Sequence, residues 1–117
     1  MYEKLLEAII SLRPDIQSAS IISAGKVIET RSKDSDPDLA VDDLRRMLLQ
    51  VDIFSSMPAT NEKLYGKVQF ILISHEMINA FLIPLSADST LVVAFLRGQN
   101  FESLLEKTLL LLDGSGA

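Results

Sequence analysis

The sequence predicts a single α+β domain with the element order helix, two strands, helix, three strands, helix. Three observations favour this fold class. Apolar residues recur at helical spacing near both ends and in the middle of the chain. Five runs rich in Ile, Val and Leu lie between these helices. The last three runs are joined by connections too short for a parallel crossover, so they form an antiparallel meander.

The N-terminal elements are a helix and a hairpin. Apolar residues at Leu5, Leu6, Ile9, Ile10 and Leu12 predict a helix over 2–13. Pro14 disfavours helical backbone at the residue before it, so the helix ends there. Strands follow over 16–24 and 26–30. Ala24-Gly25 provides a two-residue turn between them, because glycine tolerates the positive φ that such turns require.

The middle helix is predicted from Pro37 to about Phe54. Asp36 caps it, Pro37 fits the first helical position, and Asp38 adds negative charge at the positive end of the helix dipole. The helix has more apolar residues than one narrow face can hold, which indicates that it buries two sides. These residues are Leu39, Ala40, Val41, Leu44, Met47, Leu48, Leu49, Val51 and Phe54.

The second half continues, after a loop, with strands over 67–74, 78–85 and 90–97. These strands are apolar at nearly every position, a pattern typical of strands covered on both faces. A final helix is predicted over 101–112, with Asn100 as its cap. We therefore expect one domain over residues 1–113 and a flexible tail over 114–117.

Composition excludes several classes of function. The 117 residues contain no Cys, which excludes disulfides and thiolate chemistry, and the formal net charge is −5. An acidic chain is repelled by nucleic-acid backbones, so we expect no nucleic-acid binding. Charges interrupt the apolar N-terminal stretch, and no apolar run elsewhere approaches the ~20 residues that span a bilayer. We expect a cytoplasmic protein without membrane insertion.

None of the candidate catalytic, metal or phosphate-binding sites has all the residues that it would need. Asp34, Asp36 and Asp38 have the alternate spacing of a calcium loop, but the sixth position is Leu39 and the twelfth is Arg45. His75 is the only histidine and has no partner for nucleophilic catalysis or zinc binding. The five glycines form no phosphate-binding loop. We therefore predict no catalytic residue, no metal and no cofactor, and a protein that is not an enzyme.

Two features favour self-association. The strand over 67–74 is apolar on both sides, and one strand of the meander must lie at a sheet edge. An apolar edge strand promotes aggregation unless it is paired. The middle helix is also more apolar than one sheet face requires. A symmetric dimer, in which this edge meets its own copy and the middle helices pack together, satisfies both features.

The segment LRPDIQSASIISAGKVIE resembles the opening of roadblock-type domains, of the roadblock/dynein light-chain family. The segments KVQFILIS, INAFLIPL and TLVVAFLR look like the three closing strands of that family, and FESLLEKTLLLL looks like its terminal helix. Two departures are a shorter first turn, which lacks the usual Asp-Gly, and a final helix without a small-residue start. A longin or profilin-like fold is the alternative.

The resemblance implies a five-stranded antiparallel sheet with one helix on one face and two on the other. It also implies a homodimer built from the second helix and third strand of each copy. Carried onto this chain, that interface comprises Leu44, Met47, Leu48, Val51, Val68, Phe70 and Leu72. Members of the family bind small Ras-like GTPases as activators or scaffolds. The candidate contacts to such a partner are Asp42, Asp43, Arg45, Arg46 and Gln50. The simpler interpretation of the four charged residues is a solvated helix face with local ion pairs.

These observations favour a non-catalytic homodimeric adaptor that binds and regulates a small Ras-like GTPase. The alternative is a passive structural subunit of a larger protein assembly. A small-molecule sensor is disfavoured, because no polar residues are seen to converge on an apolar pocket.

Overall fold

The computed structural model describes residues 2–32, 41–56, 61–86, 88–98 and 100–115. It contains four helices and five strands within those ranges. In chain order they are α1 (Glu3–Ile10), β1 (Ile16–Ser23), β2 (Lys26–Ser32), α2 (Val41–Ser56), α3 (Glu62–Tyr65), β3 (Ile71–Ser74), β4 (Ile78–Pro84), β5 (Ser89–Leu96) and α4 (Phe101–Ser115).

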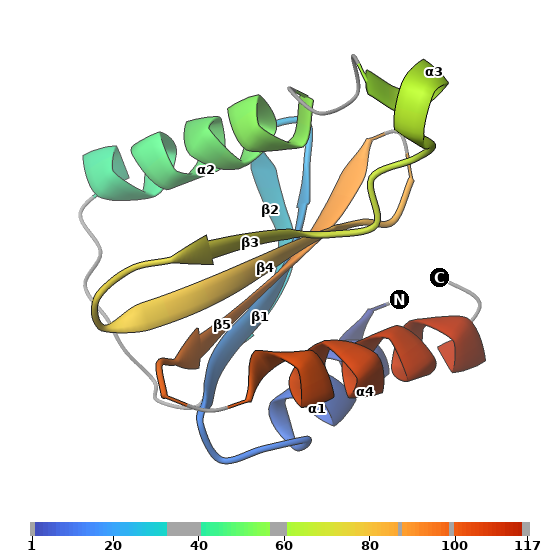
Figure 1. Ribbon diagram of the computed structural model, residues 1–117. Coiled ribbons are helices and arrows are strands. Elements are labelled where there is room, and N and C mark those ends of the chain that lie inside the picture. The colour runs from blue at the N-terminus through green and yellow to red at the C-terminus, as the bar shows by residue number, and fades with distance from the viewer. Residues whose placement is uncertain (1, 33–40, 57–60, 87, 99, 116–117) are drawn as a thin grey trace.

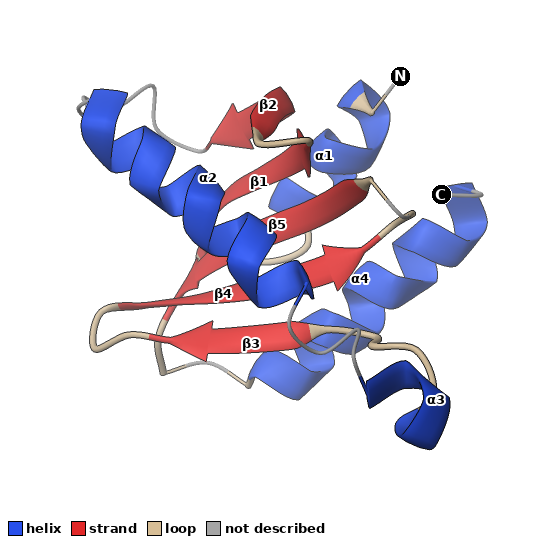
Figure 2. Cartoon of the chain, turned by 90° about the horizontal axis from the view of Figure 1, so that it is seen from above, coloured by secondary structure: helices blue, strands red, loops and turns tan. Residues whose placement is uncertain are grey.

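The five strands form one antiparallel sheet in the order β2-β1-β5-β4-β3. Helices α1 and α4 cover one face together, and α2 lies across the other face (Figure 1). Figure 2 shows α2 running obliquely over the strands, with α3 projecting beyond the sheet. The predicted five-stranded antiparallel sheet with helices on both faces is confirmed.

The hydrophobic core lies between the sheet and the pair α1 and α4. Cross-strand pairing aligns Leu72, Phe81, Val93 and Ala19 in one row on this face. Phe81 also packs against Phe95, with ring centroids 4.9 Å apart. Successive side chains of a strand point to opposite faces, so this row indicates which residues face the core within each regular stretch of strand. The register shift between Ile16 and Ser18 allows Ile16 to join Ala19 and Ile21 in the core.

The β1–β2 hairpin closes through the predicted two-residue turn. Ala24 has φ 52° and Gly25 has φ 74°, and Ser23 pairs with Lys26 across the turn. Positive φ at both central residues belongs to the type I′ turn, whose twist matches the flanking strands. The register shifts between Ile21 and Ile22, which introduces an irregularity near the turn.

A polar cluster ties the start of β1 to the start of α4. The Arg13 guanidinium binds both carboxylate oxygens of Asp15, at 2.9 and 2.6 Å, and donates to the Asn100 carbonyl. The Asn100 side chain accepts hydrogen bonds from the backbone N–H groups of Glu102 and Ser103. The predicted Asn100 cap is therefore confirmed.

Several predicted boundaries were wrong. Helix α1 ends at Ile10, because the chain turns before Pro14. Helix α4 continues to Ser115, so residues 114 and 115 belong to it and not to a tail. The loop predicted after α2 contains the short helix α3. The predicted cap at Asp36, Pro37 and Asp38 lies outside the described residues.

The strand predicted over 67–74 is confined to Ile71–Ser74. At the edge of the sheet, β3 has β4 as its neighbour on one side. Their pairing ends at Ile71 and Leu82, two residues before Pro84, where β4 itself ends. Residues 67–70 therefore have no paired strand beside them within the described chain, although their sequence is apolar enough for one.

Candidate dimer surface

The β3 edge of the sheet carries apolar side chains and no charge. Ile71, Leu72 and Ile73 are each half-buried, and β3 ends with the exposed Ser74. An edge strand presents unpaired backbone donors and acceptors, and an apolar one is a template for another strand. The edge therefore has both the backbone groups and the apolar side chains that pairing with a second strand requires.

The hydrogen-bond alternation shows which backbone groups point outward. The His75 N–H donates to the Ile78 carbonyl at 2.9 Å. In the same register Ile73 lies opposite Ala80 and Ile71 opposite Leu82. Hydrogen-bonded and non-hydrogen-bonded pairs alternate along an antiparallel ladder, so Leu72 and Ser74 direct their N–H and C=O groups to the open edge.

The three strand residues predicted for the dimer interface have different surroundings. The Leu72 side chain packs against the core, and the Phe70 ring lies edge-on to Phe81 with centroids 6.1 Å apart. Val68 precedes β3 and is half-buried. For Leu72, any contribution to strand pairing would therefore come from its backbone, since its side chain faces α1 and α4.

Ile71 and Ile73 are the β3 side chains on the face covered by α2. Ile71 pairs with Leu82, which pairs in turn with Val92, and Ile73 pairs with Ala80, which pairs in turn with Ala94. Sequence reasoning missed these two isoleucines. The run Ile71-Leu72-Ile73 has no polar alternation, so its pattern could not indicate which residues face α2.

Helix α2 presents a second apolar surface on the same side. One flank lies over the β1–β2 turn, because Asp52 Oδ2 is 3.3 Å from the position that a Cβ on Gly25 would occupy. At 3.6 residues per turn, Met47 and Phe54 lie about 140–160° around the helix from Asp52. Both are exposed, and the flank opposite the β1–β2 turn is the flank toward β3.

Of the other predicted interface residues on α2, Val51 is half-buried. The side chains of Leu44 and Leu48 lie outside the described set. The structure thus places Met47 on an exposed flank of α2, on the side where the sheet edge is open. Phe54, one heptad further along, shares that flank and was not among the predicted residues.

The outward surface of α2 mixes polar and apolar side chains. Arg46 and Gln50, two of the predicted partner contacts, are exposed. The side chains of Asp42, Asp43 and Arg45 fall outside the described set. Leu49 and Ile53 are exposed on the same outward surface and were missed as contacts. Their exposure explains the excess of apolar residues in this helix, which burial against the sheet does not require.

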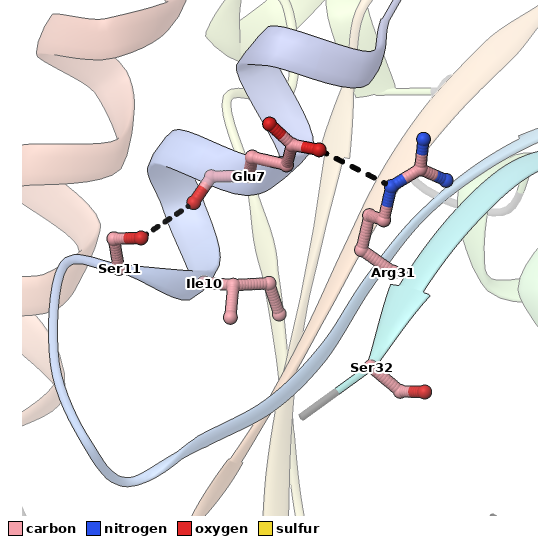
Figure 3. Close-up of a pocket in the computed structure, with 5 residues that line it drawn as sticks. All are labelled: Glu7, Ile10, Ser11, Arg31 and Ser32. Carbon is pink, nitrogen blue, oxygen red and sulfur yellow. Dashed lines mark hydrogen bonds and ion pairs between the residues drawn. The ribbon is translucent and has the colours of Figure 1, made fainter. Parts of the chain in front are cut away.

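A pocket of about 350 Å³ lies between α1 and β2, lined by Glu7, Ile10, Ser11, Arg31 and Ser32 (Figure 3). Its polar groups serve the protein itself. Arg31 Nε lies 3.9 Å from Glu7 Oε1, and the Ser11 hydroxyl donates to the Glu7 carbonyl. The pocket lies at the opposite edge of the sheet from β3, and its charged side chains pair with each other within the chain.

The residues tested for chemistry are not assembled into a site. His75 lies exposed in the β3–β4 turn, and Asp34, Asp36 and Asp38 fall outside the described residues. Within the described chain, no three His, Cys, Asp or Glu residues are close enough to hold a metal ion. A search of the described residues for a helix long and apolar enough to cross a membrane also finds none.

Solved structures provide the comparison for this fold. No protein-family model matches the chain, and no curated protein matches it in sequence. A roadblock/LC7 domain from Streptomyces avermitilis has a TM-score of 0.73 at 16% identity, covering 95% of this chain and 91% of that domain.

Two further structures agree over similar lengths. The gliding protein MglB from Thermus thermophilus has a TM-score of 0.70 at 16% identity, with 90% of this chain and 79% of that chain covered. MglC from Myxococcus xanthus has a TM-score of 0.62 at 20% identity, with 92% of each chain covered. The fold inferred from the sequence resemblance is confirmed: this chain has the roadblock/LC7 fold.

Proposed function

We propose that this chain is a non-catalytic homodimeric adaptor that binds and regulates a small Ras-like GTPase. The observation that carries the dimer is the β3 edge, which is apolar and uncharged and lies on the side toward which Met47 and Phe54 of α2 are exposed. Pairing two such edges would satisfy the outward backbone groups of Leu72 and Ser74 and cover the apolar side chains beside them.

The GTPase partner is proposed from the roadblock fold and from the outward surface of α2. In the dimer, two α2 helices would lie side by side and form one continuous platform. Leu49 and Ile53 would provide its apolar contacts, with Arg46 and Gln50 beside them as polar contacts. Interfaces of this kind combine a small apolar centre with a polar rim that guides association.

Regulation would act on the partner's own catalytic groups. If the adaptor accelerates GTP hydrolysis, we expect it to order the switch loops of the GTPase, because an inserted arginine is only one of the routes to activation. The test mixes the purified chain with GTP-loaded and GDP-loaded Ras-like GTPases from the same cell. Binding and the hydrolysis rate are measured in parallel.

A matched pair of variants locates the platform. Leu49→Asp places a charge on the outward surface of α2, whereas Leu110→Asp places one on the exposed surface of α4. We expect Leu49→Asp to abolish GTPase binding without changing the dimer mass, and Leu110→Asp to change neither. Absence of binding to every such GTPase would contradict the proposal and favour the alternative of a passive structural subunit.

A further inference from the structure

A short apolar projection lies beside the β3 edge. Helix α3 carries Leu64 and Tyr65, whose side chains are 75% and 84% exposed. Large apolar side chains at this exposure gain nothing from the fold of a single chain. Lys67 follows the helix and is exposed, so residues 64–67 combine two apolar side chains with one exposed positive charge. Glu62 and Lys63, at the start of the same helix, are exposed and carry opposite charges.

A second exposed apolar residue lies at the other end of β3. Met77 in the β3–β4 turn is 81% exposed, and the neighbouring Glu76 is also exposed. Figures 1 and 2 both place α3 and this turn at opposite ends of β3. Within one chain the two features therefore lie too far apart to contact each other.

Antiparallel pairing of two β3 strands would bring these ends together. The outward backbone groups lie at Leu72 and Ser74, so a two-fold axis must relate even positions to even positions. An axis at Leu72 pairs Phe70 with the partner's Ser74, and an axis at Ile73 pairs Leu72 with the partner's Ser74. Both use every outward group of β3, and the axis at Leu72 brings the α3 end of one copy closer to the β3–β4 turn of the other. The register with its axis at Leu72 sets Lys67 opposite the partner's Met77, and Val68 opposite the partner's Glu76.

We infer that the α3 projection, residues 64–67, docks on the β3–β4 turn, residues 75–77, of a second copy of this chain. The inference rests on the dimer of the proposed function and adds two symmetric contacts at the ends of the paired strands. Leu64 and Tyr65 cover the partner's Met77, and the positive charge of Lys67 lies within a Debye length of the negative charge of the partner's Glu76. Apolar contact and opposite charge thus favour the same occupant.

The absence of cysteine makes the inference testable by disulfide formation. In the variant Lys67→Cys with Met77→Cys, both new thiols are at exposed positions, so the fold is preserved. Under mild oxidation we expect a covalent dimer that reductant reverses. Its formation should be at least about tenfold faster than in the control, because docking raises the effective thiol concentration toward the millimolar range.

The matched control is Lys67→Cys with Leu110→Cys, which retains one thiol and moves the other to exposed α4. Light scattering on both variants before oxidation separates the two hypotheses. A dimer mass with no disulfide above the control would overturn the docking inference and leave the homodimer standing. A monomer mass in the unmodified chain would overturn both.

Charge reversal provides an independent test without new thiols. Lys67→Glu and Glu76→Lys should each weaken the dimer by roughly two- to five-fold, the range expected when two weak, exposed charge contacts are lost from a symmetric dimer. The double variant should restore the affinity of the unmodified chain. If the two single effects simply add in the double variant, the pairing of Lys67 with the partner's Glu76 is wrong.

Discussion

At the β2 edge the sheet carries charged side chains and an irregular register, whereas at the β3 edge it carries three consecutive apolar residues. The Arg31 guanidinium at the β2 edge lies 3.7 Å from Glu3, 3.9 Å from Glu7 and 3.3 Å from Glu29. These contacts join the edge strand to α1. Charges and bulges on an edge strand prevent it from pairing with another chain.

The difference between the edges determines what kind of assembly this sheet can form. If both edges were apolar, copies could add at either side and grow without limit. With one edge protected by charge and the other open, pairing of identical β3 edges closes after two copies. The contrast therefore supports a dimer rather than a filament, and substitutions at either edge test it.

The largest effect is expected from Met47→Asp, on the α2 flank toward β3. The substitution places an unpaired carboxylate in a contact that dimerisation would desolvate, and two-fold symmetry makes it occur twice. A desolvated unpaired charge costs about 3–5 kcal/mol, so we expect the dissociation constant of the dimer to rise by more than about 100-fold. Analytical ultracentrifugation measures this directly, and an unchanged dissociation constant would exclude this flank from the interface.

A smaller effect is expected from Ser74→Pro. Ser74 directs its N–H outward, so proline removes a donor from the open edge without removing a hydrogen bond to β4. Two lost backbone hydrogen bonds in the dimer weaken it on the order of tenfold. The thermal stability of the monomer should be unchanged.

The control for Ser74→Pro is Ile28→Lys, an exposed position on the protected β2 edge. This substitution should leave the dissociation constant of the dimer unchanged. If Ile28→Lys weakened the dimer as much as Ser74→Pro, the two edges would not differ in the way described, and the β2 edge would belong to the interface.

The smallest effect is expected from Arg31→Ala at the β2 edge. Removing the guanidinium leaves Glu3, Glu7 and Glu29 without their shared cation. Glu3 and Glu7 are exposed, whereas Arg31 and Glu29 are partly buried, so solvent screens two of the three contacts. We expect a loss of about 1 kcal/mol in the free energy of unfolding. Urea denaturation at low and high salt measures it. The loss should shrink in high salt, and a salt-independent loss would contradict an electrostatic origin.

The sequence was sufficient to predict the order of the five strands and of the three longer helices, and a single sheet with helices on both faces. Local sequence features identified these elements: the Ala24-Gly25 turn, the Asn100 cap and the long apolar runs of β4 and β5. Each signal acts locally, through backbone geometry or through a cap, so it is visible in a short window of sequence.

The candidate site was harder to predict, because its geometry depends on neighbours. In Ile71-Leu72-Ile73 every residue is apolar, and only the pairing with β4 assigns Leu72 to the core and Ile71 and Ile73 to the α2 face. The four residues of α3 are too few to show helical periodicity. The exposure of Leu49 likewise depends on how α2 lies on the sheet.

The mass of the unmodified chain, measured by light scattering, decides whether the homodimer forms, since every contact proposed at the β3 edge depends on a second copy. A homodimer gives a particle of twice the 12.9 kDa mass of one chain, stable on dilution into the low micromolar range. A particle of 12.9 kDa under the same conditions would contradict the claim that this open edge and the flank of α2 form a homodimer.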